Sequence, residues 1–438
     1  MKVLHVCSFY QPVGGAEKLL FSVLDLLEER GVENVVLAPA SQSGGATGRR
    51  REHFVDFLEY PFERSGVFAS IRDNRRLTTA ITELLEQERP DVIHLHNQQN
   101  PFIYKACTDS GIPMVRNLHD PRLYCPTNWR LLPDGSLCPY AFGRACITQG
   151  CVKPTPSEVK HVAVMAWHRH LSFKNTTMII ESQESYDLAL QNGYTEDQLC
   201  LIPNCTSVPS SEEAVAAEKA AAYKPGGNQL LFVGRASREK GLPFLLHALT
   251  RVHHDFTLNL LTAGDYYHHE IAPLITRLGL ESRVNVRLNT SYADTAKHYA
   301  SADVVIVPSV WFETFCLVGI EAYAHMTPVI ATRVGGIKDW CIDGETGLLV
   351  DVFDEEALAD RIDTMLADPD LRERLGRNGF RRAQQLYSEQ EYFKRLQALY
   401  EKVVTDGTRH ADRLPRMAGR SVQSGSRLFD IQPQDSRP

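Results

Sequence analysis

The fold is decided by the stretch Asp303-Val-Val-Ile-Val-Pro-Ser-Val-Trp-Phe-Glu313-Thr-Phe-Cys-Leu-Val-Gly-Ile-Glu321. Its first five residues are mostly β-branched and apolar, which predicts a buried strand. The polar loop that follows contains Glu313, and the run ending at Glu321 predicts a helix that Thr314 or a neighbour caps. A buried strand followed at once by a helix is typical of a parallel α/β sheet.

The spacing of the two carboxylates in this stretch suggests a ligand. Glu313 and Glu321 lie eight residues apart, one in the loop and the other roughly two turns along the helix. The helix start between them exposes unpaired N–H groups that suit a phosphate. A nucleotide sugar has this layout of sugar hydroxyls, diphosphate and ribose hydroxyls. Taken alone, however, a loop glutamate followed by a solvated helix glutamate is the commoner explanation.

Composition narrows the classes of protein. A chain of 438 residues favours two domains, and its net charge of -7, without a long basic block, gives no support for a nucleic-acid partner. No apolar run approaches eighteen residues, so no transmembrane helix is expected. The apolar start, residues 1–7, is too short for a signal peptide and predicts a first strand. We therefore expect a cytoplasmic protein whose ten cysteines are mostly reduced.

Two series of alternating strands and helices indicate an α/β protein with two Rossmann-like parallel-sheet domains facing a cleft, where ligands bind beyond the strand ends. The first predicted strands are Val3–Cys7, Val35–Ala38, Asp91–His96, Met114–Leu118, Met178–Ile180 and Leu199–Ile202. The second are Gln229–Val233, Leu258–Ala263, Val284–Arg287, Val304–Val307 and Pro328–Ala331. The predicted division is an N-terminal domain 1–206 with a Cys-rich insert 121–155, a linker 207–228, a C-terminal domain 229–388, a helix 389–404 and a disordered tail 405–438.

Charged and glycine-rich turns follow the first strand of each predicted domain. Arg235 leaves the strand at residues 229–233 and Lys240 follows five residues later, so both cations can converge on a diphosphate. Gly14 and Gly15 open the first helix, where backbone can approach a phosphate closely. Each turn also has an ordinary explanation, as a solvated loop or as simple turn geometry.

Histidines in the N-terminal domain are also candidates. His119 follows a predicted strand and could hydrogen-bond a sugar hydroxyl or a phosphate. His94 and His96 share one face of their strand, as a metal pair would, but no third ligand is evident and packing is favoured.

Four of the ten cysteines, Cys125, Cys138, Cys146 and Cys151, lie close together in the insert. This clustering suggests a shared role. The spacings contain no C-x2-C pair, so a zinc ion or another cluster is one alternative, beside disulfides and ordinary free thiols. Free thiols are favoured.

Taken together in this order, the motifs resemble those of a GT-B glycosyltransferase of glycosyltransferase family 4, the retaining group with an E-x7-E element. The resemblance spans about residues 1 to 404. It rests on Gly14-Gly15-Ala-Glu17, Asp91-Val-Ile-His-Leu-His96, Leu118-His-Asp120, Ile202-Pro-Asn204, Val233-Gly-Arg235, Glu239-Lys-Gly241, Ala263-Gly-Asp265, Pro308-Ser309, Glu313 to Glu321, Gly335-Gly336 and Gly344-Glu-Thr-Gly347.

The resemblance implies a transferase that moves a sugar from a nucleotide-diphosphate sugar to a hydroxyl acceptor, in polysaccharide or glycoconjugate biosynthesis. It also implies a C-terminal helix that crosses back to the N-terminal domain, and neither a required cofactor nor a catalytic metal. In the implied site, Glu321 binds the ribose, and Glu313 and His119 contact the donor sugar. The diphosphate is bound by Arg235, Lys240, Gly14, Gly15 and the backbone of Thr314, Phe315, Cys316 and Leu317. Asp368-Pro-Asp370, although it spells D-x-D, is interpreted as a turn between helices.

Some features leave other interpretations open. A sugar-nucleotide epimerase of the same architecture and a non-catalytic nucleotide-sugar binder are the alternatives. Lys338-Asp339 departs from the family pattern, in which an acidic residue is commoner at the lysine position. The basic, aromatic segment Lys160–Lys174 could rest on the inner face of a membrane, as a lipid-linked glycan acceptor would favour, or form an ordinary surface helix.

Overall fold

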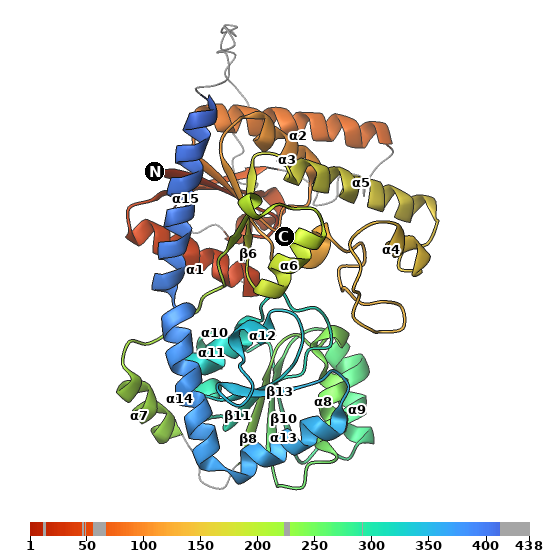
Figure 1. Cartoon of the computed structure of the whole chain (residues 1–438), viewed down its shortest axis with the longest axis vertical. Coiled ribbons are helices and arrows are strands. Elements are labelled where there is room, and N and C mark those ends of the chain that lie inside the picture. Colours follow the sequence, from red (N-terminus) through yellow and green to blue (C-terminus); the bar gives the residue numbers. More distant parts are fainter. Residues whose placement is uncertain are drawn as a thin grey trace, which may run out of the picture.

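The computed structural model describes residues 1–11, 15–45, 48, 50–55, 67–222, 228–290 and 292–411. Two parallel sheets, each flanked by helices, stack along the long axis of the molecule (Figure 1). This arrangement confirms the predicted α/β class with two parallel-sheet domains.

The N-terminal sheet has seven strands in the order β3-β2-β1-β4-β5-β6-β7, all parallel. Its order reverses at β1, so the strands on either side of that point carry their connecting helices to opposite faces. The strands are β1 Lys2–Cys7, β2 Glu33–Pro39, β3 Arg51–Val55, β4 Val92–His96, β5 Met114–Asn117, β6 Thr176–Ile180 and β7 Leu199–Leu201. The helices are α1 Gly15–Glu29, α2 Val67–Glu88, α3 Pro101–Asp109, α4 Arg144–Thr148, α5 Pro156–Ser172 and α6 Gln183–Gln191.

The C-terminal sheet has six parallel strands in the order β10-β9-β8-β11-β12-β13. Its strands are β8 Gln229–Val233, β9 Thr257–Thr262, β10 Val284–Leu288, β11 Val304–Val307, β12 Val329–Thr332 and β13 Gly347–Val350. Its helices are α7 Glu212–Ala222, α8 Leu242–Leu249, α9 Ala272–Arg277, α10 Tyr292–Ser301, α11 Leu317–Ala324, α12 Ile337–Trp340, α13 Glu355–Ala367 and α14 Pro369–Leu386.

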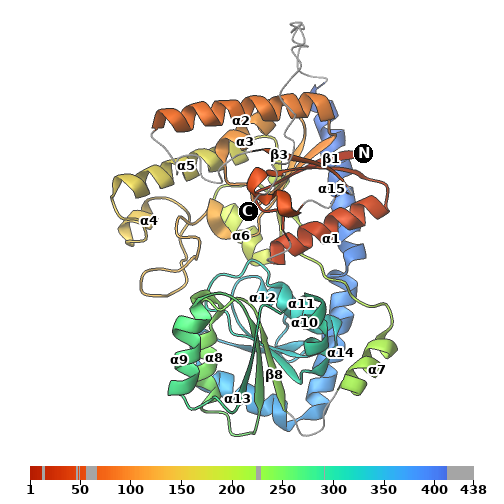
Figure 2. The ribbon, with the colours of Figure 1, turned by 180° about the vertical axis from the view of Figure 1, so that it is seen from behind.

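The last described helix, α15 Glu389–Ala411, returns from the C-terminal half and lies along the N-terminal sheet in both views (Figures 1 and 2). Tyr392, Leu396 and Tyr400 pack in one core cluster with Val3 and Val92. The crossing helix is therefore as expected, but it continues past the predicted end at residue 404, and residues 405–411 are helical rather than part of a disordered tail. Residues 412–438 lie outside the described part of the chain.

Helix α7 lies in the segment that was predicted to be a linker, and it packs against the C-terminal half. The Lys219 ammonium donates to the carbonyl oxygen of Ala302 at 3.0 Å and to Thr327 Oγ1 at 2.7 Å. Val215 packs against Met326 and Phe380. The helix thus adds a layer to the C-terminal half rather than hanging between the two halves.

The predicted turn at residues 368–370 is also present. Asp368 is the N-cap of α14, and its Oδ1 accepts a hydrogen bond from the backbone N–H of Leu371 at 2.9 Å. A carboxylate used in this way satisfies an otherwise unpaired helix donor. The D-x-D sequence therefore serves a helix start, as interpreted.

Candidate functional site

A cavity of about 360 Å³ lies between the two halves of the chain. The C-terminal half supplies most of its wall, at the carboxyl ends of β8, β9, β10 and β11, and the N-terminal half supplies His119, Glu181 and Asn204. Crevices at the carboxyl ends of parallel strands are the usual ligand sites of such sheets. The sites expected from sequence therefore fall where the fold favours binding.

An ion pair joins two of the predicted site residues. Lys240 Nζ donates to Glu313 Oε1 at 2.7 Å, and the Ser309 hydroxyl donates to the same oxygen at 2.6 Å. Although burial works to raise the pKa of the Glu313 carboxyl, the Lys240 ammonium holds that pKa below its ordinary value. Burial works to lower the pKa of Lys240, but Glu313 keeps that pKa above its usual value. Both groups are therefore charged at neutral pH.

Two glycines allow the loops of this site to approach each other. Gly241 has a φ of +71°, and a Cβ there would lie 1.8 Å from the carbonyl oxygen of Pro308. Gly335 has a φ of +48°, and a Cβ there would lie 1.9 Å from the carbonyl oxygen of Glu313. Only glycine fits this conformation and contact. The loop that carries Lys240 is consequently held against the loop that follows β11.

The start of α11 faces the cavity without a side-chain cap. Its N-cap residue is Cys316, which has a φ of 72° and makes no side-chain cap hydrogen bond. Cys316, Leu317 and Val318 all line the cavity. Of the residues expected to cap the helix, Thr314 or a neighbour, the neighbour Cys316 occupies the N-cap position, and the Thr314 hydroxyl donates instead to the carbonyl oxygen of His119 at 3.0 Å. Uncapped N–H groups and the positive end of the helix dipole favour an anion here.

Glu321 and Arg235 also line this cavity. Glu321 projects from α11, and Tyr299 on α10 donates its hydroxyl to Glu321 Oε2 at 2.7 Å. The Arg235 side chain is 72% exposed and reaches Glu239 only at 3.6 Å. Glu321 is thus held in place, whereas Arg235 can swing toward a ligand.

On the N-terminal side, His119 and Glu181 form a buried pair through His119 Nδ1. Burial alone would lower the pKa of His119, but the Glu181 carboxylate raises it above its ordinary value. A smaller cavity that His119 also lines includes Glu17, from the first turn of α1. His119 therefore presents a protonatable ring to both cavities.

Two segments of the C-terminal half hold the halves together at the cavity. Asp339 Oδ2 accepts a hydrogen bond from the backbone N–H of Gln183 at 2.5 Å, and Lys338 pairs with Glu184. Phe312 packs in a core cluster of the N-terminal half. The lysine that departs from the family pattern thus makes a contact between domains rather than lining the cavity.

The predicted site residues divide into three groups. His119, Arg235, Lys240, Thr314, Cys316, Leu317 and Glu321 line the one cavity. Glu313 and Phe315 do not: Glu313 lies behind Lys240, and the Phe315 ring belongs to the C-terminal core. Gly15 is the first residue of α1, and Gly14 lies outside the described residues.

Sequence reasoning missed two residues on the N-terminal wall. Glu181 comes directly after β6, so the strand-end argument that identified His119 applied to it equally. Asn204 lines the cavity with its buried Oδ1 lacking a hydrogen-bond partner. A buried amide oxygen in this state is a ready acceptor for a ligand donor.

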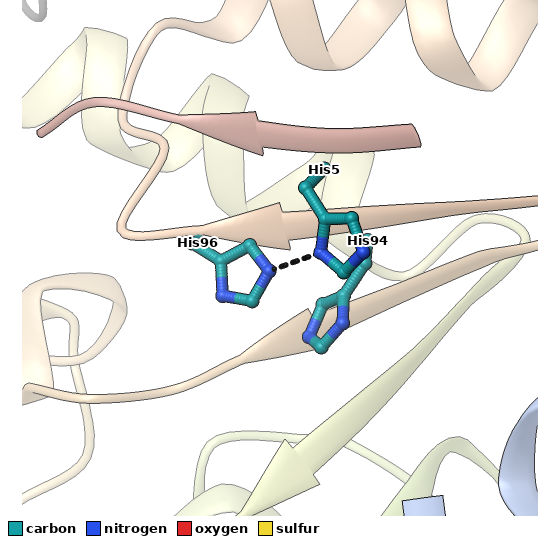
Figure 3. A group of neighbouring side chains, drawn as sticks. All are labelled: His5, His94 and His96. Atoms are coloured by element: carbon teal, nitrogen blue, oxygen red, sulfur yellow. Dashed lines mark hydrogen bonds between the residues drawn. The ribbon is translucent and has the colours of Figure 1, made fainter. Parts of the chain in front are cut away.

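The histidines of β1 and β4 form a compact group (Figure 3). Sequence analysis found no third partner for His94 and His96, whereas the structure places His5 beside them, with ligand nitrogens all within 4.8 Å of one another. His5 is hydrogen-bonded to His96 at 3.0 Å and to Asn34 at 3.1 Å.

Both ring nitrogens of His94 are also engaged, by Tyr400 at 2.6 Å and by Asn117. Burial lowers the pKa of His5 to about 3, and it lowers the pKa of His94 and His96 as well, so the three rings are neutral. A metal ion would have to break these hydrogen bonds. The three histidines therefore form a buried, hydrogen-bonded group that packs between β1, β4 and α15.

Two family models match the chain in succession. One, described as "Glycosyltransferase Family 4", matches residues 13–208, and the other, "Glycosyl transferases group 1", matches residues 216–382. Curated relatives include the capsular polysaccharide biosynthesis glycosyltransferase CapM of Staphylococcus aureus, 32% identical over 39% of this chain and 44% of CapM. Another is the D-inositol 3-phosphate glycosyltransferase of Corynebacterium glutamicum, 34% identical over 41% of this chain and 45% of that protein. The chain thus matches less than half the length of these relatives.

Solved structures resemble the whole chain. Sucrose-phosphate synthase from Thermosynechococcus elongatus has a TM-score of 0.69 at 20% identity, covering 93% of this chain and 100% of that one. HepE from Anabaena, in complex with UDP, has a TM-score of 0.64 at 19% identity, covering 94% and 100%. At such identity these likenesses establish the fold.

Proposed function

This chain belongs to glycosyltransferase family 4 and has the GT-B fold, and on that premise we propose that it is a retaining hexosyltransferase. The proposed reaction moves a sugar from a nucleotide-diphosphate sugar to a hydroxyl acceptor, during polysaccharide or glycoconjugate biosynthesis. One observation carries the proposal: Lys240, Arg235 and the uncapped start of α11 border the same cavity as Glu321. Two cations and a helix N-terminus suit a diphosphate, and a nearby carboxylate suits ribose hydroxyls.

On the donor side of this site, the charges of Lys240 and Glu313 are already paired. Glu313 lies against Lys240 and Ser309, so we assign it the positioning of the Lys240 ammonium, while its predicted contact with donor-sugar hydroxyls remains a proposal. Arg235 closes on the diphosphate from the exposed rim. HepE binds UDP and UDP-glucose, which makes uridine the first base to test.

The proposed reaction occurs on one face of the sugar. The acceptor oxygen forms a bond to the anomeric carbon as the bond from that carbon to the leaving phosphate oxygen breaks. The leaving phosphate takes the acceptor proton, and the products are a glycoside with retained configuration and a nucleoside diphosphate. Lys240, Arg235 and the helix start stabilise the negative charge that develops on the phosphate. No protein base is needed, and none is assigned.

A second cavity, of about 460 Å³, suits the acceptor. It lies between the insert and the C-terminal half, and its lining includes Trp129, Leu131, Arg238 and Phe353. Trp129 also meets Trp311 edge-on, with ring centroids 5.7 Å apart. Aromatic rings beside a cation are suited to a glycan, whose rings stack on apolar faces while its hydroxyls take hydrogen bonds.

Contact with a membrane surface is a finer proposal. Within the described residues, no helix is both long and apolar enough to cross a bilayer. In α5, the buried and neutral His168 accepts a hydrogen bond from Arg116, and the Arg169 guanidinium donates to the carbonyl oxygen of Asn192, so both side chains serve the fold. Toward the end of this segment, the exposed His170 and Lys174 suit an anionic surface.

Turnover with UDP-, GDP- and ADP-sugars tests the proposed function. We expect one donor to release nucleoside diphosphate in the presence of a glycan or lipid-linked glycan acceptor, with a glycoside as the second product. An exposed lysine far from the cavity, in Lys394→Ala, provides the control. Turnover that survives Lys240→Ala combined with Glu313→Ala would contradict the site, and product formed without any acceptor would instead favour an epimerase.

A further inference from the structure

The insert between His119 and α5 contains little regular structure. Within residues 121–155 the structure has a short turn at Pro121–Leu123, the five-residue helix α4 and an isolated bridge between Leu131 and Leu137. Segments that lack a substantial core of their own are usually fastened by disulfides or by a metal ion. The insert is therefore a segment that a disulfide or a metal ion would be expected to stabilise.

The four cysteines of the insert all line one small cavity. Cys125 is buried, and the other three are partly buried around the cavity. All four are free thiols, so disulfides do not fasten the insert. The backbone N–H of Arg130 donates to Cys125 Sγ at 3.4 Å, as amide donors commonly do to the thiolates of metal sites.

The Arg130 side chain supplies an independent observation. It lines the same cavity, is 5% exposed, and its Nε has no hydrogen-bond partner. Among the described residues this guanidinium has no recorded ion pair with a carboxylate, and it donates to the carbonyl oxygen of Tyr140. A buried cation is costly without a negative partner. The cavity thus contains a charge that neutral thiols do not balance.

We propose that Cys125, Cys138, Cys146 and Cys151 bind one Zn²⁺ ion that fastens the insert. Each thiol loses its proton to solvent on binding, so four thiolates and one Zn²⁺ form a centre of charge -2, which Arg130 partly neutralises. Among the described residues, only the three histidines already have ligand atoms all within 4.8 Å of one another. The cysteine side chains must therefore rotate toward the cavity as the ion binds.

The site would act on the acceptor side of the molecule. Cys151 lines both the small cavity and the larger one that contains Trp129 and Phe353. Fixing the cysteines would therefore fix one wall of the proposed acceptor cavity. The donor cavity has no lining residue in the insert. This consequence depends on the proposed function, but binding of zinc does not.

Metal analysis of the untagged chain tests the proposal. The protein is purified in a reducing, zinc-containing buffer and exchanged into a metal-free one, and zinc is then measured by mass spectrometry. We expect about one zinc ion per chain, and its loss in Cys138→Ser and in Cys146→Ser. The matched control is Cys200→Ser, a half-buried cysteine on β7, outside the insert, which should keep its zinc.

A titration of the wild type keeps the test independent of whether the variants fold. An organomercurial added stepwise should release the zinc as four thiols react. A chain with no zinc and four freely reactive insert thiols overturns the proposal, and so does zinc that survives both variants. Iron with acid-labile sulfide in place of zinc contradicts the choice of metal, and cysteines found as disulfides contradict the whole site.

Discussion

The two walls of the cavity are built in different ways. The C-terminal wall comes from strand ends of one sheet, and its Lys240 and Glu313 are already paired at 2.7 Å within one domain. The N-terminal wall consists of His119, Glu181 and Asn204, and it meets the other wall through loops such as the one carrying Thr314. The charged groups of the C-terminal wall are thus already positioned within one domain, whereas the position of the N-terminal wall depends on how the two domains meet.

The largest effect is expected on the preorganised wall. In Lys240→Ala, kcat/KM should fall about 10²- to 10³-fold because one charge-stabilising donor is lost at the leaving phosphate. The substitution should also destabilise the fold by about 3 kcal/mol, because Glu313 is left buried and unpaired. Steady-state kinetics and chemical denaturation measure the two effects.

A double variant separates catalysis from stability on this wall. Lys240→Ala with Glu313→Gln removes both charges, so stability should largely return while turnover stays low. If activity recovered together with stability, Lys240 would be a structural residue only. The C-terminal wall would then contribute no charge stabilisation through Lys240.

The next largest effect is expected on the other wall, with a pH dependence. In Glu181→Gln, kcat/KM should fall about 10-fold, as His119 loses its partner. Because the Glu181 carboxylate raises the pKa of His119 in the folded state, the pair's stabilisation is fully present below the unfolded pKa of about 6.5 and is lost as pH rises through the folded pKa. The stability gap between wild type and variant should therefore be widest near pH 5 to 6 and shrink at higher pH.

Thermal unfolding across that pH range measures this gap. The exposed Glu196 provides the control in Glu196→Gln, whose gap from wild type should be small at every pH. A gap between wild type and Glu181→Gln that widens with rising pH would mean that His119 is neutral in the folded protein. The N-terminal wall would then contribute no positive charge.

A smaller effect should follow from separating the walls. A Cβ at Gly336 would lie 2.3 Å from the carbonyl oxygen of Thr314 and 2.6 Å from Ser182 Cβ, on the other domain. Gly336→Ala should therefore open the cavity, lower kcat/KM several-fold and enlarge the radius of gyration in small-angle scattering. Gly44→Ala, where the new methyl meets only Gln11 Nε2 at 3.6 Å, should change neither quantity.

The smallest effect is expected at Glu321. Tyr299→Phe removes the hydroxyl that donates to Glu321 Oε2 at 2.7 Å. The lost hydrogen bond acts on the nucleotide only through Glu321, so about 0.5 kcal/mol, the lower end of the usual net contribution, should reach binding, and affinity for the donor nucleotide should weaken about twofold. Calorimetry measures this change, and unchanged affinity would remove Glu321 from the nucleotide contacts.

What the sequence predicted best lies on the C-terminal wall. Strands β8 and β11 begin and end where their apolar, β-branched runs do, because buried parallel strands carry continuous apolar residues. Two strands were missed. β3 lies at the sheet edge and begins with three polar residues, Arg51-Glu-His, and β13 has only four residues, next to a glycine-rich turn.

The side-chain partnerships were less predictable. The ion pair of Lys240 with Glu313 and the contact of Thr314 with His119 join residues 73 and 195 positions apart. No local pattern encodes such pairs, since they depend on how loops and domains pack. The third histidine, His5, was missed for the same reason, because strand order places β1 beside β4.

Binding of nucleoside diphosphates to the wild type and to Lys240→Ala tests the proposed donor site most directly. One of UDP, GDP and ADP should raise the melting temperature, because at a hundred times Kd a ligand adds about 2.7 kcal/mol of stability. That shift should be lost in Lys240→Ala and kept in Lys394→Ala. A nucleotide that protects both variants equally, or no protection by any of the three at millimolar concentration, would contradict it.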